Sequence, residues 1–188
     1  MIPARLLCLA FALVFSSTAQ AETAIYGTGT YEAFGFTGSN YSSGGSFKKA
    51  TGGVNGGVFF TFPTESRFKA SIDGRILYGA GKNGGQAYTG AFRVSFVPQH
   101  NRLRPYFQIG GGVASTQLTS PICSGFSCSI QQRRVSNGVA QLAFGIDVRA
   151  TDHMDIRAFD YGADAGSGTG AAHAAAGFLD AGLVYHFH

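Results

Sequence analysis

The chain has 188 residues, of which only 13% are charged, and its formal net charge is +4. A typical soluble domain carries about 25% charged residues, and so mild and dispersed a positive charge argues against a nucleic-acid-binding surface. With 45% hydrophobic residues, the chain is also too apolar for a disordered polymer, despite its 28 glycines.

Residues 1–21 have the parts of a secretory signal peptide. One basic residue precedes an apolar run over residues 6–15, and Ala19 and Ala21 supply the small side chains of a cleavage site. The run is too short for a helix that spans a membrane. We therefore expect export, cleavage after Ala21 and one folded domain over residues 22–188.

The apolar residues after the leader are spread along the chain rather than gathered in runs. They alternate with polar residues over segments of about ten positions, which is typical of membrane-spanning strands. A sheet in lipid must pair all its backbone polar groups, so it must close, and its lipid-facing positions must be apolar. An exported chain with this pattern indicates a membrane β-barrel.

Period-two alternation predicts eight strands. The clearest is residues 67–78, where Arg67, Lys69, Asp73 and Arg75 share one parity and the other parity carries no charge. The apolar faces would meet lipid and the charged faces would line the lumen. The predicted strands span residues 23–36, 53–62, 67–78, 88–97, 104–116, 138–149, 154–161 and 178–187.

The seventh predicted strand changes its pattern near Phe159. Asp155 and Arg157 share the polar parity, but Asp160 falls on the apolar one, while Phe159 and Tyr161 take the other. Either a β-bulge near Phe159 or an early exit from the membrane would account for this change. The sequence does not decide between them.

The connections alternate in length. Residues 37–50, 80–87, 117–137 and 162–177 are long and rich in small or polar residues, whereas residues 63–66, 98–103 and 150–153 are short. Long outer loops and short periplasmic turns are the usual asymmetry of an outer-membrane barrel. The sequence thus predicts an all-β, eight-stranded, antiparallel up-and-down transmembrane barrel.

Two cysteines, Cys123 and Cys128, lie in the third long connection and flank Gly125. In an oxidising compartment such a pair indicates a disulfide that closes a small exposed loop. Two free thiols are the alternative, and metal binding is disfavoured because no His or carboxylate accompanies them. We expect local stiffening rather than redox catalysis.

Charges of both signs are expected inside the barrel. An eight-stranded barrel is just wide enough for side chains to fill it, and buried charges must pair. Salt bridges would then close the lumen, although a narrow pore for ions or small solutes through rearranged pairs is the alternative. The predicted lumen charges are Glu32, Arg67, Lys69, Asp73, Arg75, Arg93, Asp147, Arg149, Asp155, Arg157 and Asp180.

The last predicted strand has a distinctive order of residues. Asp180, Gly182, Tyr185 and Phe187 give polar–x–Gly–x–x–aromatic–x–aromatic, which resembles the C-terminal assembly signal of bacterial outer-membrane barrels. That signal usually ends on the aromatic residue, whereas here His188 follows. The resemblance implies that this strand pairs with the first and is recognised by the barrel-assembly machinery.

With residues 154–161 as the penultimate strand, residues 22–188 resemble the small eight-stranded outer-membrane proteins of the OmpA/OmpX kind. The resemblance implies the outer membrane of a Gram-negative (diderm) bacterium, with outer-membrane lipid and lipopolysaccharide as partners. It implies very little about activity. We expect a monomer that acts as a structural or surface-interaction protein through its outer loops.

No catalytic, cofactor or metal constellation stands out. His153, His173 and His186 lack a serine two residues away on a strand, so an enzyme that modifies lipid A at the membrane rim is disfavoured. His186 and His188 are too few ligands to indicate a metal. We therefore expect that the protein is not an enzyme and binds no cofactor. A soluble, lipocalin-like barrel is disfavoured because too few charges remain to cover an exterior.

Overall fold

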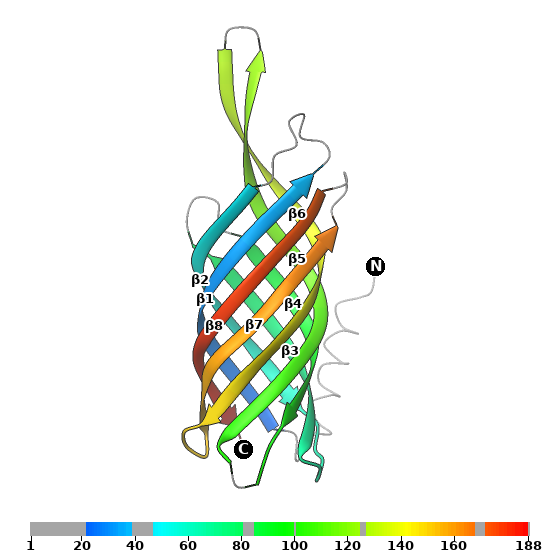
Figure 1. Cartoon of the computed structure of the whole chain (residues 1–188), viewed down its shortest axis with the longest axis vertical. Helices are drawn as coiled ribbons and strands as arrows, with labels where there is room; N and C mark the ends of the chain where they lie inside the picture. The colour runs from blue at the N-terminus through cyan, green and yellow to red at the C-terminus, as the bar shows by residue number, and fades with distance from the viewer. Residues whose placement is uncertain are drawn as a thin grey trace, which may run out of the picture.

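The computed structural model describes residues 22–38, 47–80, 85–99, 101–124, 127–167 and 172–187, so the predicted signal peptide lies outside it. Each strand pairs antiparallel with the next, and β1 also pairs with β8, so the sheet closes into a barrel (Figure 1). The predicted fold class is confirmed. The strands are β1 (Glu22–Gly38), β2 (Phe47–Thr61), β3 (Phe68–Gly79), β4 (Gln86–Phe96), β5 (Leu103–Ser124), β6 (Ser127–Arg149), β7 (Met154–Ser167) and β8 (Ala172–Phe187).

The barrel closes between its first and last strands. Thr23 pairs with Phe187, and the register continues without a shift until Gly38 lies opposite Ala172. The predicted pairing of the closing strand with the first strand is confirmed, and the start of β1 and the end of β8 share one end of the barrel. Within the described ranges, no helix has the length and apolar character needed to cross a membrane.

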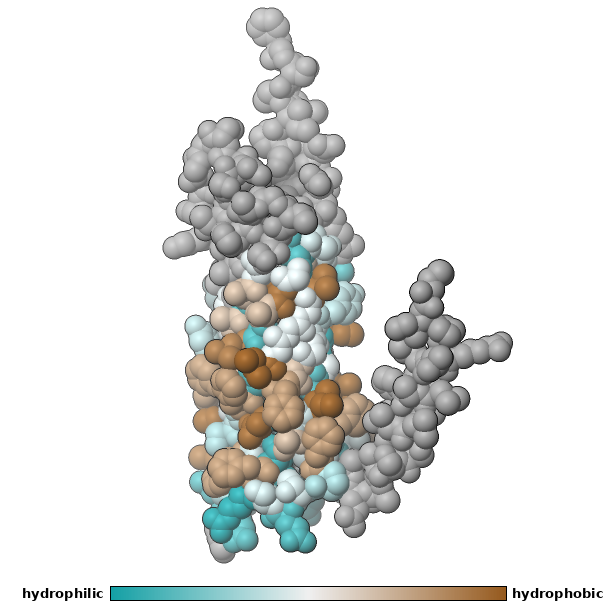
Figure 2. Space-filling view, turned by 90° about the vertical axis from the view of Figure 1, so that its right-hand side faces the viewer, coloured by the Kyte–Doolittle hydropathy of each residue, from teal (hydrophilic) through white to brown (hydrophobic). Residues whose placement is uncertain are grey.

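The two faces of the sheet differ as period-two alternation predicts. Large apolar side chains on the outer face are between 43% and 61% exposed, and they contribute to the apolar band in Figure 2. The buried inner face carries ten charged residues, with Asp73 inside and its neighbour Ile72 outside. Since this arrangement is the reverse of a soluble barrel, the lipid-facing exterior explains the low charge of the chain.

Aromatic rings inside the barrel pack over glycines of the neighbouring strand. Tyr26 is paired in register with Gly57, and Tyr106 with Gly145. A Cβ atom on Gly57 would lie 2.5 Å from Tyr26 Cζ, and one on Gly145 would lie 2.5 Å from the Tyr106 hydroxyl oxygen. Phe178 and Gly162 repeat the arrangement. These glycines therefore make room for the rings in a narrow lumen.

Strand β7 contains a bulge, which settles the question left open by its sequence. The register with β6 shifts between Ile146 and Asp147, and Ala158 is the additional residue of β7. Beyond the bulge, Asp160 points into the lumen and is fully buried. The bulge interpretation is therefore confirmed, and β7 continues in register with β6 to Ser167.

Several strands extend further toward the long connections than predicted. The prediction that residues 117–137 form a loop is wrong, because β5 reaches Ser124 and β6 begins at Ser127, forming a hairpin that projects beyond the barrel (Figure 1). Nine of the 21 residues from 117 to 137 are Ser, Thr or Gln. A strand outside lipid needs no apolar face, so a search for lipid-type alternation cannot detect it.

Candidate functional site

The lumen holds the most polar buried surface of the protein. Alternation turns every second residue of each strand inward, and the narrow barrel brings these side chains together. The charged residues Glu32, Asp73, Arg75, Arg93, Asp147, Asp155, Arg157, Asp160, Asp164 and Asp180 are each at most 8% exposed. A buried charge without a partner costs several kcal/mol, so their contacts decide what the lumen can do.

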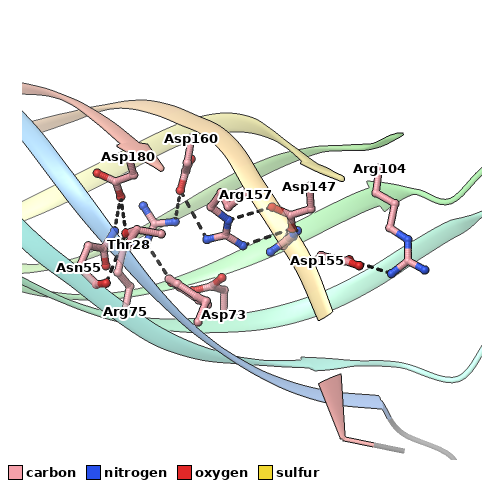
Figure 3. Close-up of polar contacts among 12 residues, drawn as sticks. Thr28, Asn55, Asp73, Arg75, Arg104, Asp147, Asp155, Arg157, Asp160 and Asp180 are labelled. Carbon is pink, nitrogen blue, oxygen red and sulfur yellow. Dashed lines mark hydrogen bonds and ion pairs between the residues drawn. The ribbon is translucent and has the colours of Figure 1, made fainter. Parts of the chain in front are cut away.

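A connected ion-pair network crosses the middle of the lumen (Figure 3). Arg157 Nε lies 2.9 Å from Asp147 Oδ1, and Arg157 Nη1 lies 3.8 Å from Asp160 Oδ2. Arg75 Nη2 lies 2.6 Å from the same Asp160 oxygen, and Arg93 pairs with Asp147. Each of these aspartates therefore binds two arginines that come from different strands.

The same arginines lie against aromatic rings. The Arg93 guanidinium carbon is 3.7 Å from the centre of the Tyr106 ring and 4.4 Å from that of Phe59. That of Arg157 is 4.2 Å from the centre of the Tyr26 ring. Stacking on aromatic faces stabilises desolvated guanidinium groups and fills the space beside the ion pairs. The middle of the lumen is thus occupied by side chains.

Tyr26 links a further aspartate to the network. Its hydroxyl group donates a hydrogen bond to Asp73 Oδ1 at 2.8 Å and accepts one from Arg75 Nε at 3.1 Å. Tyr26 comes from β1 and the other two residues from β3, so this contact passes over the intervening strand β2. The hydroxyl group offsets part of the cost of burying the Asp73 carboxylate.

Toward the long connections the lumen is acidic. Asp180 accepts hydrogen bonds from the side chains of Asn55 and Thr28, and Asp164 accepts one from Gln141 Nε2 at 3.0 Å. In the described part of the chain, Glu32 Oε2 has no hydrogen-bond partner. Amide and hydroxyl donors therefore hold carboxylates in this half, whereas arginines hold those in the middle.

At the short-turn end, a second group of charged side chains links four strands. Asp155 Oδ2 lies 2.9 Å from Arg104 Nη1 and 2.9 Å from His186 Nε2. The other ring nitrogen of His186 lies 2.5 Å from Glu22 Oε1. These contacts join β5, β7, β8 and β1 and narrow the mouth of the lumen at this end.

Comparison with known proteins gives the fold an independent support. No family model and no curated protein matches the sequence. The structure is similar to Neisserial surface protein A (13% identity, 87% of this chain and 99% of that chain covered, TM-score 0.51). It is also similar to Ail, the attachment invasion locus protein of Yersinia pestis (13% identity, 89% and 99% covered, TM-score 0.50).

The chain has the fold of the small eight-stranded outer-membrane β-barrels. The predicted resemblance to the OmpA/OmpX kind is confirmed at this level. At 13% identity the likeness concerns the fold alone. What the barrel does must therefore be argued from its own side chains.

Eight of the eleven charges predicted to line the lumen of this outer-membrane barrel fold are buried there, and three near the short turns are not. Lys69 is half-buried at the mouth. The prediction that Arg67 and Arg149 line the lumen is wrong, because both side chains are exposed. Arg67 precedes the first residue of β3, and Arg149 is the last residue of β6 and pairs with Asp152 of the following turn.

Two lumen carboxylates were missed by sequence reasoning, Asp160 and Asp164. The bulge at Ala158 reverses the parity of everything after it, so Asp160 looked lipid-facing. Asp164 lay beyond the predicted end of the strand at residue 161, although β7 continues. A signal was present: Asp160, Gly162 and Asp164 share one parity, and large or apolar residues occupy the other.

The four residues of the closing-strand pattern separate between the two faces of β8. Tyr185 and Phe187 lie on the outer face, with their ring centres 5.0 Å apart. Asp180 is buried in the lumen. Gly182 lies where β1 approaches closely, since a Cβ atom there would be 2.6 Å from Thr28 Cα. The glycine of the pattern thus permits the seam to close, and recognition by assembly machinery stays a prediction.

Cys123 and Cys128 lie directly opposite each other in the register of the β5–β6 hairpin. Opposed backbone positions on neighbouring strands are compatible with a disulfide, which stays a prediction. Within the ranges that the structure covers, no three His, Cys, Asp or Glu side chains are arranged to hold a metal ion.

Proposed function

We propose that the chain is an outer-membrane protein whose closed barrel is a scaffold and whose long-connection end binds partners at the cell surface. In this orientation the short turns face the periplasm, as is usual for such barrels. The apolar exterior supports insertion in a membrane, and the predicted signal peptide supports export.

The filled lumen is the observation that carries the scaffold role. Arg75, Arg157, Asp147 and Asp160 are at most 3% exposed and connect walls of the barrel at mid-height. An ion moving along the axis would have to separate buried pairs, each at a cost of about 3–5 kcal/mol. A lumen filled in this way favours a rigid scaffold over a pathway for ions.

The charge of the long connections supports a surface role. Residues 39–50, 80–87 and 117–137 carry basic residues and no acidic ones. In the proposed orientation they face the outer leaflet, where the phosphates of lipopolysaccharide lie, and Arg and Lys bind phosphate well. The basic residues are Lys48, Lys49, Lys82, Arg133 and Arg134.

Two measurements test the location and the closed lumen. Cell fractionation should recover the protein in the outer-membrane fraction, from which only detergent should extract it. Release of the protein by osmotic shock would overturn the location. Planar-bilayer recording of the purified protein should show no steady single-channel conductance. A reproducible conductance would overturn the scaffold proposal.

Binding to lipopolysaccharide vesicles tests the surface role. The variant K48Q/K49Q/R133Q/R134Q should bind lipopolysaccharide at least about tenfold more weakly than the unchanged protein, because charge-assisted hydrogen bonds contribute about 1.5–3 kcal/mol each. The variant R67Q, which removes a basic residue at the other end, should bind normally. Lipid A from expressing cells should keep its mass, whereas a mass shift would favour an enzyme.

A narrow cation pathway is the second candidate, because Glu32, Asp164 and Asp180 make the outer half of the lumen acidic. It requires the arginine network to rearrange. The same bilayer recording separates the candidates, since a pathway of this kind would give a cation-selective conductance that increases in the variant R75A/R157A.

A further inference from the structure

A polar cavity of about 370 Å³ lies at the short-turn end, between the β4–β5 turn and the β6–β7 turn. Three arginines, Arg102, Arg104 and Arg149, line it together with one carboxylate, that of Asp152. We propose that this cavity binds a phosphate-type oxyanion, either the phosphodiester of a lipid headgroup or a free phosphate ion.

The backbone brings the arginines to one side of the sheet. Arg149 N donates a hydrogen bond to Arg102 O at 2.8 Å, so these two residues are opposite each other where β5 and β6 meet the turns. Arg104 is two residues after Arg102 and has the same parity. Like charges placed opposite each other destabilise a sheet unless something offsets them.

The carboxylates nearby offset only part of this charge. Arg104 forms an ion pair with Asp155 of the lumen, with 2.9 Å between Arg104 Nη1 and Asp155 Oδ2. Arg149 pairs with Asp152, but both groups of that pair are largely exposed, at 46% and 84%. For the exposed side chain of Arg102, the described residues provide no ionic or hydrogen-bonded partner. The guanidinium group of Arg102 is therefore available to bind an anion. That of Arg149 is engaged only in a solvent-exposed ion pair.

Side-chain hydrogen bonds hold described residues on both sides of the cavity. Asn101 Oδ1 accepts a hydrogen bond from Leu103 N at 3.1 Å in the first turn. In the second turn the Thr151 hydroxyl oxygen accepts hydrogen bonds from the backbone nitrogens of His153 and Met154. A preformed site loses little conformational entropy when it binds, which favours a small ligand.

The chemistry of the cavity favours phosphate. Guanidinium groups form paired, charge-assisted hydrogen bonds to phosphate oxygens. A volume of about 370 Å³ is at the lower end of the usual range for ligand sites, which suits a headgroup or a small ion. The outward side chains of Leu103 and Phe68 mark the edge of the apolar exterior beside the turns, where headgroups begin.

The assignment of the anion to a periplasmic source rests on the proposed function, which places the short turns in the periplasm. The binding itself does not. The full mature chain, folded in micelles of a zwitterionic detergent, should be titrated by isothermal calorimetry with inorganic phosphate. In separate titrations the micelles should carry phosphatidylglycerol or phosphatidylcholine.

We expect one saturable site per chain for phosphate, phosphatidylglycerol or both, and weaker binding of phosphatidylcholine, because its choline cation offsets the charge of the phosphodiester. Arg102→Gln should weaken binding by about tenfold or more, as the loss of a charge-assisted hydrogen bond predicts. Arg102 is exposed, so this variant should fold, which heat-modifiability on gels would verify. Arg67→Gln removes the same charge from an exposed residue at the same end that does not line the cavity, and it should bind as the unchanged protein does.

The titrations also distinguish the sources of the anion. Competition between phosphate and phosphatidylglycerol would indicate the lipid headgroup, and binding of phosphate alone would indicate a soluble ion. The proposal is overturned by a lack of saturable binding, by equal affinities for Arg102→Gln and the unchanged protein, or by tighter binding of succinate than of phosphate. A failed fractionation or conductance test would leave these micelle titrations unaffected.

Discussion

Asp160 and Arg75 meet across the full width of the lumen, with 2.6 Å between Asp160 Oδ2 and Arg75 Nη2. They come from β7 and β3, which stand on opposite walls in the closed order of eight strands. Both side chains are almost completely buried. The pair therefore ties the two walls together, and it exists only because the bulge in β7 turns Asp160 inward.

Asp160→Ala should lower the free energy of unfolding by about 3–5 kcal/mol, because it leaves Arg75 buried without its carboxylate. The double variant R75M/D160L should recover much of this loss, since well-packed apolar groups replace the pair. Urea unfolding in phospholipid vesicles, followed by tyrosine fluorescence, measures both.

The exposed pair Arg149–Asp152 provides the control for that measurement. Asp152→Ala removes an aspartate from an arginine in the same way, but an exposed pair contributes only about 0–1 kcal/mol. If Asp160→Ala proved as mild as Asp152→Ala, the lumen pair would not be what holds the walls together.

Deletion of Ala158 should leave a folded barrel. Ala158 is the additional residue of the bulge, so its removal joins two stretches whose side chains already face correctly. Deletion of Ala163, an outward residue in the regular ladder opposite Leu142, should instead shift the register by one position and turn lumen charges toward lipid.

The two deletions remove the same residue type from the same strand, so they form a matched comparison. Heat-modifiability and protection from trypsin after refolding into micelles measure the folded fraction. We expect a fraction near that of the unchanged protein without Ala158, and little folded protein without Ala163. Equal yields would contradict the register given for β7.

The fold could be predicted because lipid imposes its pattern directly on the sequence. Each strand in the membrane must be apolar on one face, so the parity of Ile72 and Asp73 can be read without knowing their neighbours. The order of the strands in the barrel could also be predicted, because each strand pairs with the next one along the chain. The ends of β5 and β6 were missed because that constraint stops where lipid stops.

The charge pairs could not be predicted in the same way. Alternation along a strand assigns a residue to the lumen. It gives neither the position of that residue along the barrel axis nor the direction of a long side chain. Arg75 is surrounded by Tyr26, Asp73 and Asp160, and it contacts residues on strands far apart in sequence. Because the bulge shifts the alternation, Asp160 was not predicted to face the lumen. Pairing therefore depends on the three-dimensional register, which sequence alternation leaves undetermined.

Gly57→Ala should destabilise the barrel by about 1–3 kcal/mol, the usual cost of an overpacked interior. The added methyl group would overlap the Tyr26 ring and the carbonyl oxygen of Gly74, so the ring would have to move away from Asp73. At Gly90 a Cβ atom meets nothing within 4 Å, so Gly90→Ala should have little effect. Urea unfolding of the two variants compares them, and an equal loss would refute the packing argument.

The aromatic residues at the end of β8 should be needed for assembly more than for the stability of the finished barrel. Tyr185 and Phe187 contact each other on the lipid-facing side, and His153 stacks on Tyr185 with ring centres 6.2 Å apart. Tyr185→Ala and Phe187→Ala should therefore reduce the amount of folded, heat-modifiable protein in cell membranes, whereas removal of residue 188 should be tolerated.

Leu179→Ala is the matched control for the closing strand, because Leu179 is also a lipid-facing residue of β8 but lies outside the terminal pattern. It loses a comparable apolar contact with lipid, so a general effect of a smaller lipid-facing side chain would appear in all three variants. An assembly signal predicts instead that only the two aromatic variants accumulate as unfolded, protease-sensitive chains in cells, while all three refold in micelles. Normal cellular yields of Phe187→Ala would show that closure of β8 against β1 needs only the backbone register from Thr23 to Gly38 and no aromatic signal.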